Sequence, residues 1–132
     1  MLKKELIQKI AIVLFFIMFI YSGLNKIINF KKKINGLDKK IYEFLSFKLS
    51  NIFLYLGMII VILLEIIGSL IIVYYFLGGK YFSKKYIEYL LIIYLLFLII
   101  VTILYHPPTD KIIPFLSNMT TFGGLLLIYN IV

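Results

Sequence analysis

Four long apolar segments, joined by shorter connections, constrain this chain more than any other feature of its sequence. The segments are residues 6–24, 52–77, 87–105 and 114–132. A helix that crosses a membrane needs about 20 mostly apolar residues, because the hydrocarbon layer is about 30 Å thick and a helix rises about 1.5 Å per residue. The sequence therefore predicts four membrane-spanning helices.

The composition indicates that lipid is the solvent of this chain. Hydrophobic residues make up 63% of its 132 residues, against about 45–50% in an average soluble domain. A soluble protein of this length could not bury so much apolar surface. We therefore expect an all-α, multi-pass integral membrane protein, with one domain over residues 1–132 that forms a four-helix bundle in the bilayer.

The charge pattern narrows the classes of partner. The net charge is +8, and every basic residue is a lysine, placed mostly in the connections between apolar segments. Because the chain offers no domain that could bind nucleic acid, we expect no nucleic-acid partner. Lysines beside a bilayer instead attract anionic lipid headgroups, by about 1 kcal/mol each. The chain has no cysteine, one histidine and six acids, so thiol chemistry is excluded and no metal site is expected.

The longest connection, residues 25–51, combines an apolar stripe with lysines. The stripe repeats at helical spacing and consists of Phe30, Ile34, Leu37, Ile41, Phe44 and Leu45. The lysines that lie mostly off this stripe are Lys31, Lys32, Lys33, Lys39 and Lys40. The pattern predicts an amphipathic helix at the membrane interface, between the first two spans, with these lysines near anionic headgroups. A solvated linker is the alternative.

Polar residues gather toward one side of the predicted bundle. Ser22 and Lys26 end the first span and share a helical face, because they are four residues apart. Successive spans run in opposite directions, so His106 at the end of the third span and Asn118 near the start of the fourth lie on the same side. Glu65 lies near the middle of the second span. We predict that these five side chains approach one half of the bundle.

Glu65 is the strongest single indication of a site. A charged residue at the centre of a spanning helix costs about 2.5–3.5 kcal/mol, so it is expected to face the bundle interior with a partner, or to carry a proton. Lys26 and His106 are the available partners. Two interpretations stay open: the five residues form a ligand or proton site, or they form a polar network that only fixes helix packing.

Four motifs occur in order along the chain: FIYSGLNKIINF (residues 19–30), VILLEIIGSL (61–70), LFLIIVTILYH (96–106) and FLSNMTTFGGLLL (115–127). Together they resemble the pattern of the DoxX family of small four-span membrane proteins. The resemblance implies family roles for Ser22, Gly23, Lys26, Glu65, His106 and Asn118. It also implies association with membrane oxidoreductase complexes, often quinone-linked, while other relatives are chaperone-like or cargo-handling membrane proteins.

The residues and the resemblance lead us to expect a subunit of a quinone-linked membrane oxidoreductase complex. Its polar pocket would use Ser22, Lys26, Glu65, His106 and Asn118. A quinone is the candidate ligand, no cofactor motif is recognisable, and an electron-carrying protein partner or a second copy of the chain is expected. Whether the chain is itself an enzyme is open. The alternatives are a non-catalytic scaffold or chaperone and a proton-coupled transporter built around Glu65.

Overall fold

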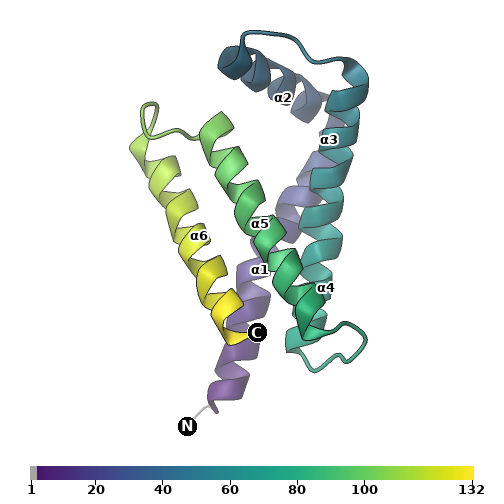
Figure 1. Cartoon of the computed structure of the whole chain (residues 1–132), viewed down its shortest axis with the longest axis vertical. Coiled ribbons are helices and arrows are strands. Elements are labelled where there is room, and N and C mark those ends of the chain that lie inside the picture. Colours follow the sequence, from purple (N-terminus) through teal and green to yellow (C-terminus); the bar gives the residue numbers. More distant parts are fainter. Residues whose placement is uncertain (1–2) are drawn as a thin grey trace. The chain divides into compact units, whose positions relative to one another are not determined.

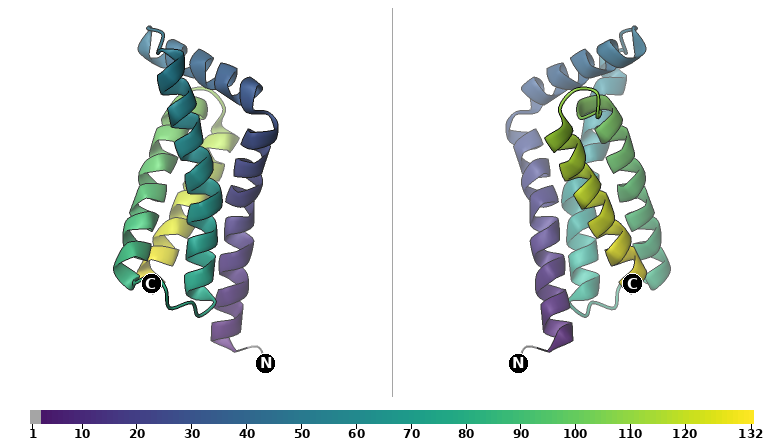
Figure 2. Two further views of the ribbon diagram at one scale, coloured as in Figure 1. Left: turned by 90° about the vertical axis from the view of Figure 1, so that its right-hand side faces the viewer. Right: turned by 90° about the vertical axis from the view of Figure 1, so that its left-hand side faces the viewer.

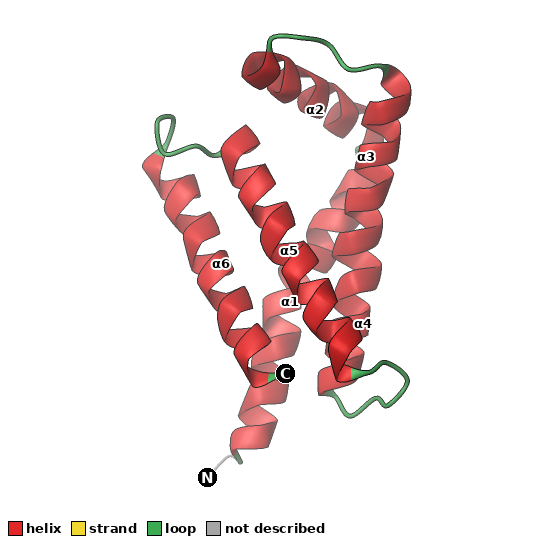
Figure 3. Ribbon diagram, viewed as in Figure 1, coloured by secondary structure: helices red, strands yellow, loops and turns green. Residues whose placement is uncertain are grey.

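The structure is a computed structural model that describes residues 3–132, and in this range it contains helices and loops but no strand (Figure 3). The helical elements are α1 (Lys4–Ile28), α2 (Phe30–Leu45), α3 (Asn51–Leu63), the π-helical turn η1 (Leu64–Gly68), α4 (Ser69–Phe76), α5 (Lys84–Tyr105) and α6 (Ile112–Ile131). The prediction of an all-α chain is confirmed for the described residues.

Four helical stretches are long and apolar enough to cross a membrane. They are α1, the continuous stretch Asn51–Phe76 that comprises α3, η1 and α4, then α5 and α6, with lengths of 25, 26, 22 and 20 residues. These lengths suit a hydrocarbon layer about 30 Å thick. Their residue ranges coincide with those of the four apolar segments, and their crossing of a membrane stays a prediction.

The chain divides into two compact units, Met1–Ser83 and Lys84–Val132 (Figure 1). In the first unit, α1 runs beside α3, η1 and α4, and it contacts all three (Figure 2). In the second unit, α5 contacts α6. The predicted single domain and the assembly of all four spans into one bundle stay predictions.

One face of α1 is buried along most of its length. Ile12, Phe16, Phe19 and Gly23 follow one another at intervals of four, three and four residues, which places them on a single helical face. The second span contributes buried residues of its own, including the fully buried Ile72. These buried residues mark the faces by which the two helical stretches pack inside the first unit.

A helix occupies the predicted position between the first two spans, and much of its apolar stripe packs inside the first unit. Ile34 of α2 forms a buried cluster with Leu54 and Met58 of α3, and the stripe residues Phe30, Leu37 and Ile41 pack against this cluster. The remaining stripe residues, Phe44 and Leu45, are exposed. The helix is thus confirmed, whereas its placement at the membrane interface stays a prediction.

Local chemistry explains where several helices end. Pro107 and Pro108 follow α5 and cannot donate the backbone hydrogen bonds that would continue it. Among residues 3–132, positive φ angles occur at Ser46, with φ of 62°, and at Gly78, with φ of 105°. Ser46 ends α2, and Gly78 lies in the turn after α4. These two residues reverse the chain direction at the ends of their helices.

Candidate functional site

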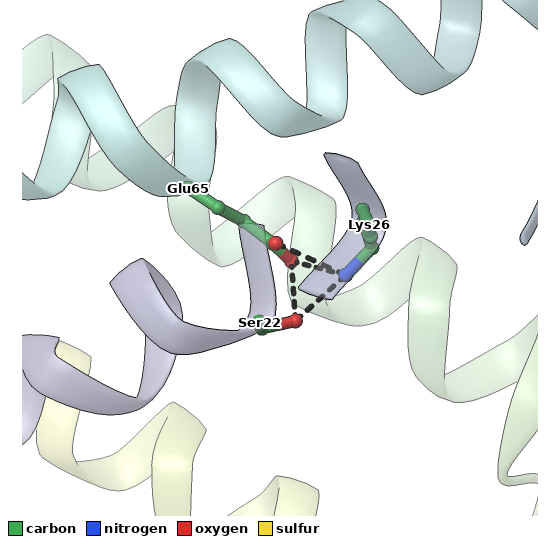
Figure 4. Close-up of polar contacts among 3 residues, drawn as sticks. All are labelled: Ser22, Lys26 and Glu65. Carbon is green, nitrogen blue, oxygen red and sulfur yellow. Dashed lines mark hydrogen bonds and ion pairs between the residues drawn. The ribbon is translucent and has the colours of Figure 1, made fainter. Parts of the chain in front are cut away.

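Three of the five predicted site residues meet between α1 and η1 (Figure 4). The Nζ atom of Lys26 lies 3.0 Å from both carboxylate oxygens of Glu65 and 2.7 Å from Oγ of Ser22. The Ser22 hydroxyl donates to Oε1 of Glu65 over 3.3 Å. These contacts close a ring of hydrogen bonds, and we call the three residues the Ser22–Lys26–Glu65 triad.

Two elements far apart in sequence build the triad. Ser22 and Lys26 lie one turn apart on α1, which is why the ammonium reaches the hydroxyl of the same helix. Glu65 follows Lys26 by 39 residues and approaches from the second span. Gly23 lies between Ser22 and Lys26 in sequence and is buried against Glu65 and Ile66. Because glycine has no side chain, it allows α1 and η1 to approach closely enough for the triad to form.

The triad is shielded from its surroundings, most of all at its acid. The side chain of Glu65 is 4% exposed and that of Lys26 is 19% exposed. A carboxylate buried to this extent requires a compensating charge and hydrogen bonds to its oxygens. Lys26 supplies the charge, and together with Ser22 it supplies the hydrogen bonds. Of the two partners predicted for Glu65, the structure therefore pairs it with Lys26.

The backbone around Glu65 departs from a regular α-helix. Residues Leu64–Gly68 form a π-helical turn, and Glu65 and Gly68 are its buried residues. Such turns inside α-helices are rare and frequently occur at functional sites. The turn interrupts an apolar span of 26 residues near its middle. The one buried acid of the span and its one irregular turn thus coincide.

A second polar contact lies in the second unit and involves Asn118. Its Nδ2 atom donates to Oγ1 of Thr102 over 3.1 Å, and the Thr102 hydroxyl donates to the carbonyl oxygen of Leu98 over 2.7 Å. Thr102 is buried and was not among the predicted site residues. The sequence feature that could have indicated Thr102 is its position as a lone hydroxyl residue within the apolar motif LFLIIVTILYH, one turn before the histidine.

His106 stands at the end of α5. Its backbone N–H donates to the carbonyl oxygen of Thr102 over 3.0 Å, which completes the last turn of the helix. Its side chain is half-buried. This position agrees with the end of the third span that the sequence predicted. The approach of His106 and Asn118 to the triad stays a prediction.

The groups of the triad define what it could do chemically. An ammonium and a hydroxyl are hydrogen-bond donors, and a carboxylate accepts hydrogen bonds or takes up a proton. A carbonyl group of a small molecule could accept hydrogen bonds from the ammonium and the hydroxyl, and a ligand hydroxyl could also donate to the carboxylate. Within residues 3–132 no group of three or more His, Asp or Glu side chains is placed to hold a metal ion. The triad therefore suits a hydrogen-bonding ligand.

Comparison of the chain with protein-family models, curated proteins and solved structures finds no match. Its relation to the DoxX family stays a resemblance that depends on the four motifs.

Proposed function

We propose that the chain is a multi-pass membrane protein of DoxX type, and that it serves as a subunit of a quinone-linked membrane oxidoreductase complex. In this proposal the Ser22–Lys26–Glu65 triad binds the polar head of a small apolar compound. The observation that carries the proposal is an ion pair between Glu65, near the middle of an apolar, span-length helix, and Lys26 in the last turn of α1. Ionisable residues within spanning helices commonly mark ligand or proton pathways.

The donors and acceptors of the triad suit a quinone head. Quinone carbonyl oxygens accept hydrogen bonds, and the Lys26 ammonium and the Ser22 hydroxyl are donors. The Glu65 carboxylate is placed to accept a proton from the Lys26 ammonium, since its oxygens lie 3.0 Å from Nζ. A bound quinone would supply the electron-accepting chemistry, and a partner protein would supply the electrons. The residues of this chain would orient the head and move protons.

Mass spectrometry of the protein, gently extracted from its native membrane, tests this proposal. We expect a co-purifying apolar redox compound with the wild-type chain, and its loss in Lys26→Met and Glu65→Gln. The matched control variants are Lys84→Gln and Glu88→Gln, because these residues form a 3.9 Å ion pair that is far more exposed. Both controls should retain the compound.

The same experiment can contradict the proposal. If only bulk lipid accompanies the wild-type chain, the triad does not hold a ligand of this class. If Lys84→Gln or Glu88→Gln removes the compound as fully as the triad variants do, binding is not located at the triad. His106→Ala and Asn118→Ala extend the test to the remaining predicted site residues.

A non-catalytic scaffold or chaperone is the second candidate, and the closed hydrogen bonding of the triad favours it. Each triad residue finds its partner in the other two, so the network could serve only to fix the register of two helices. The double variant Lys26→Met, Glu65→Leu distinguishes the two functions, because removing both charges together leaves none unpaired. Loss of the bound compound with unchanged stability supports binding. Joint loss of stability and of a protein partner supports the scaffold.

A further inference from the structure

The C-terminal turn of α2 and the residues after it expose a group of large apolar side chains. Tyr42, Phe44, Leu45 and Phe47 are 58%, 57%, 45% and 53% exposed. We call these four residues the 42–47 cluster. The earlier part of the same apolar stripe packs against α3. The earlier part of the stripe therefore belongs to the core of the first unit, whereas the side chains at its C-terminal end are exposed.

The 42–47 cluster is held in place from both sides. Before it, Ile34 anchors α2 in the buried cluster with Leu54 and Met58 of α3. At the end of the helix, the backbone N–H of Ser46 donates to the carbonyl oxygen of Tyr42 over 2.9 Å, and Ser46 adopts the left-handed conformation. The exposed rings are therefore presented by an ordered helix end.

The charge around the cluster is strongly positive. Residues 30–48 contain six lysines and two acids, a net charge of +4. Lys39 and Lys48, which flank the cluster in sequence, are exposed. Lys40 lies 4.0 Å from Glu43, so one of the two acids is already taken by a neighbouring lysine. The partner that complements this charge is an anionic one.

We propose that the 42–47 cluster, with Lys39 and Lys48, is a contact site for anionic phospholipid. Aromatic side chains favour the headgroup level of a bilayer, and helices with apolar and basic faces bind there. Each lysine near the surface favours anionic lipid by about fivefold, which corresponds to about 1 kcal/mol. The proposal places the lipid contact at the end of α2 and does not depend on the ligand of the triad.

The absence of tryptophan allows this site to be probed by the fluorescence of one introduced residue. The chain has no tryptophan, so Phe47→Trp introduces a single indole within the cluster. Tyr129→Trp is the matched control, because Tyr129 is 38% exposed near the end of α6 and is 18 residues from Lys111, its nearest lysine in sequence. The full chain is reconstituted in nanodiscs of phosphatidylcholine and phosphatidylglycerol, in which one lipid or the other carries bromine as a quencher.

A headgroup that contacts one of the two lysines should be favoured about fivefold. In the Phe47→Trp protein we therefore expect brominated phosphatidylglycerol to reach half-maximal quenching at about one fifth of the mole fraction that brominated phosphatidylcholine requires. Lys39→Gln and Lys48→Gln, introduced together, should remove most of this preference, whereas Lys84→Gln should leave it unchanged. Equal quenching by the two lipids would overturn the anionic preference. An indole that neither lipid quenches would show that the cluster faces water or a protein, and would overturn the site itself. A preference of the same size at Tyr129→Trp would also overturn it.

Discussion

Gly23 of α1 and Ile66 of η1 lie so close together that a methyl group on the glycine would meet Cγ1 of Ile66 at 2.5 Å. The same methyl group would lie 3.1 Å from Cδ1 of Ile66 and 3.2 Å from Cβ of Glu65. Small residues permit this approach between helices in lipid, where close packing replaces the hydrophobic driving force. The glycine therefore sets the separation across which the triad forms.

Gly23→Ala is accordingly expected to destabilise the protein. Forcing a methyl group into a packed contact costs about 1–3 kcal/mol, because side chains or backbone must shift. Gly57→Ala in α3 is the matched control, since nothing lies within 4 Å of its new methyl group. Thermal unfolding in mild detergent should show a lower Tm for Gly23→Ala and an unchanged or higher Tm for Gly57→Ala. Equal Tm values for the two variants would contradict the close contact.

The triad predicts unequal effects for its two charged residues. Lys26→Met leaves the carboxylate of Glu65, 4% exposed, without its counter-charge. Breaking a buried pair in this way costs about 3–5 kcal/mol. Glu65→Gln leaves Lys26, which is 19% exposed and whose long side chain can extend toward water, so its cost should be smaller.

Thermal unfolding of the two single variants and of the double variant Lys26→Met, Glu65→Gln measures this asymmetry. The double variant should be more stable than Lys26→Met alone, because no charge is left unpaired. Lys9→Met, which breaks the exposed pair with Glu5, is the control and should cost less than about 1 kcal/mol. A double variant as unstable as the sum of two independent losses would show that the ion pair has no part in stability.

In the second unit, the hydrogen bond from Asn118 to Thr102 is expected to couple α5 and α6. Hydrogen bonds between membrane helices contribute about 0.6 kcal/mol on average and at most about 1.7 kcal/mol. A double-mutant cycle with Thr102→Val and Asn118→Ala should give a coupling energy in this range. Thr121→Val is the control, because the Thr121 hydroxyl donates to the Ser117 carbonyl of its own helix. A coupling energy of zero would rule out a contribution from this bond.

The turn after α4 depends on the backbone of Gly78. Its φ of 105° is unfavourable for residues with a Cβ atom, although nothing lies within 4 Å of an added methyl group. Gly78→Ala should therefore lower stability by about 1–2 kcal/mol through backbone strain alone. Gly36→Ala, in the interior of α2 and also without close neighbours, should raise it by about 0.5–1 kcal/mol. We therefore expect a lower Tm for Gly78→Ala and a higher Tm for Gly36→Ala. Shifts of the same sign in both variants would contradict the strain at Gly78.

The length of the four apolar segments predicted the long helices well, because a helix that crosses a membrane must be apolar along most of its length. The spacing of Ser22 and Lys26 also predicted their shared face, and their 2.7 Å hydrogen bond confirms it. Glu65 was expected to have a partner because an unpaired charge is costly in an apolar span. The structure gives it Lys26, one of the two partners that the sequence offered.

Other features leave little trace in a single sequence. The π-helical turn at Leu64–Gly68 adds no polar residue beyond Glu65, so hydropathy alone cannot distinguish it from a regular helix. Thr102 was missed because one hydroxyl in an apolar helix commonly bonds to its own backbone, and the contact from Asn118 depends on tertiary packing. The packing of Ile34 on Leu54 and Met58 was missed because an apolar stripe suits a protein core and a lipid surface equally well.

The pairing of Lys26 with Glu65 has a consequence for how the chain is made. Glu65 is synthesised 39 residues after Lys26, and without its partner it would enter the bilayer as a bare charge, which costs about 2.5–3.5 kcal/mol on insertion scales. Insertion of the two helices together, as a hairpin already joined by the ion pair, would avoid this cost. The triad would thus link the two helices during biosynthesis as well as in the finished protein.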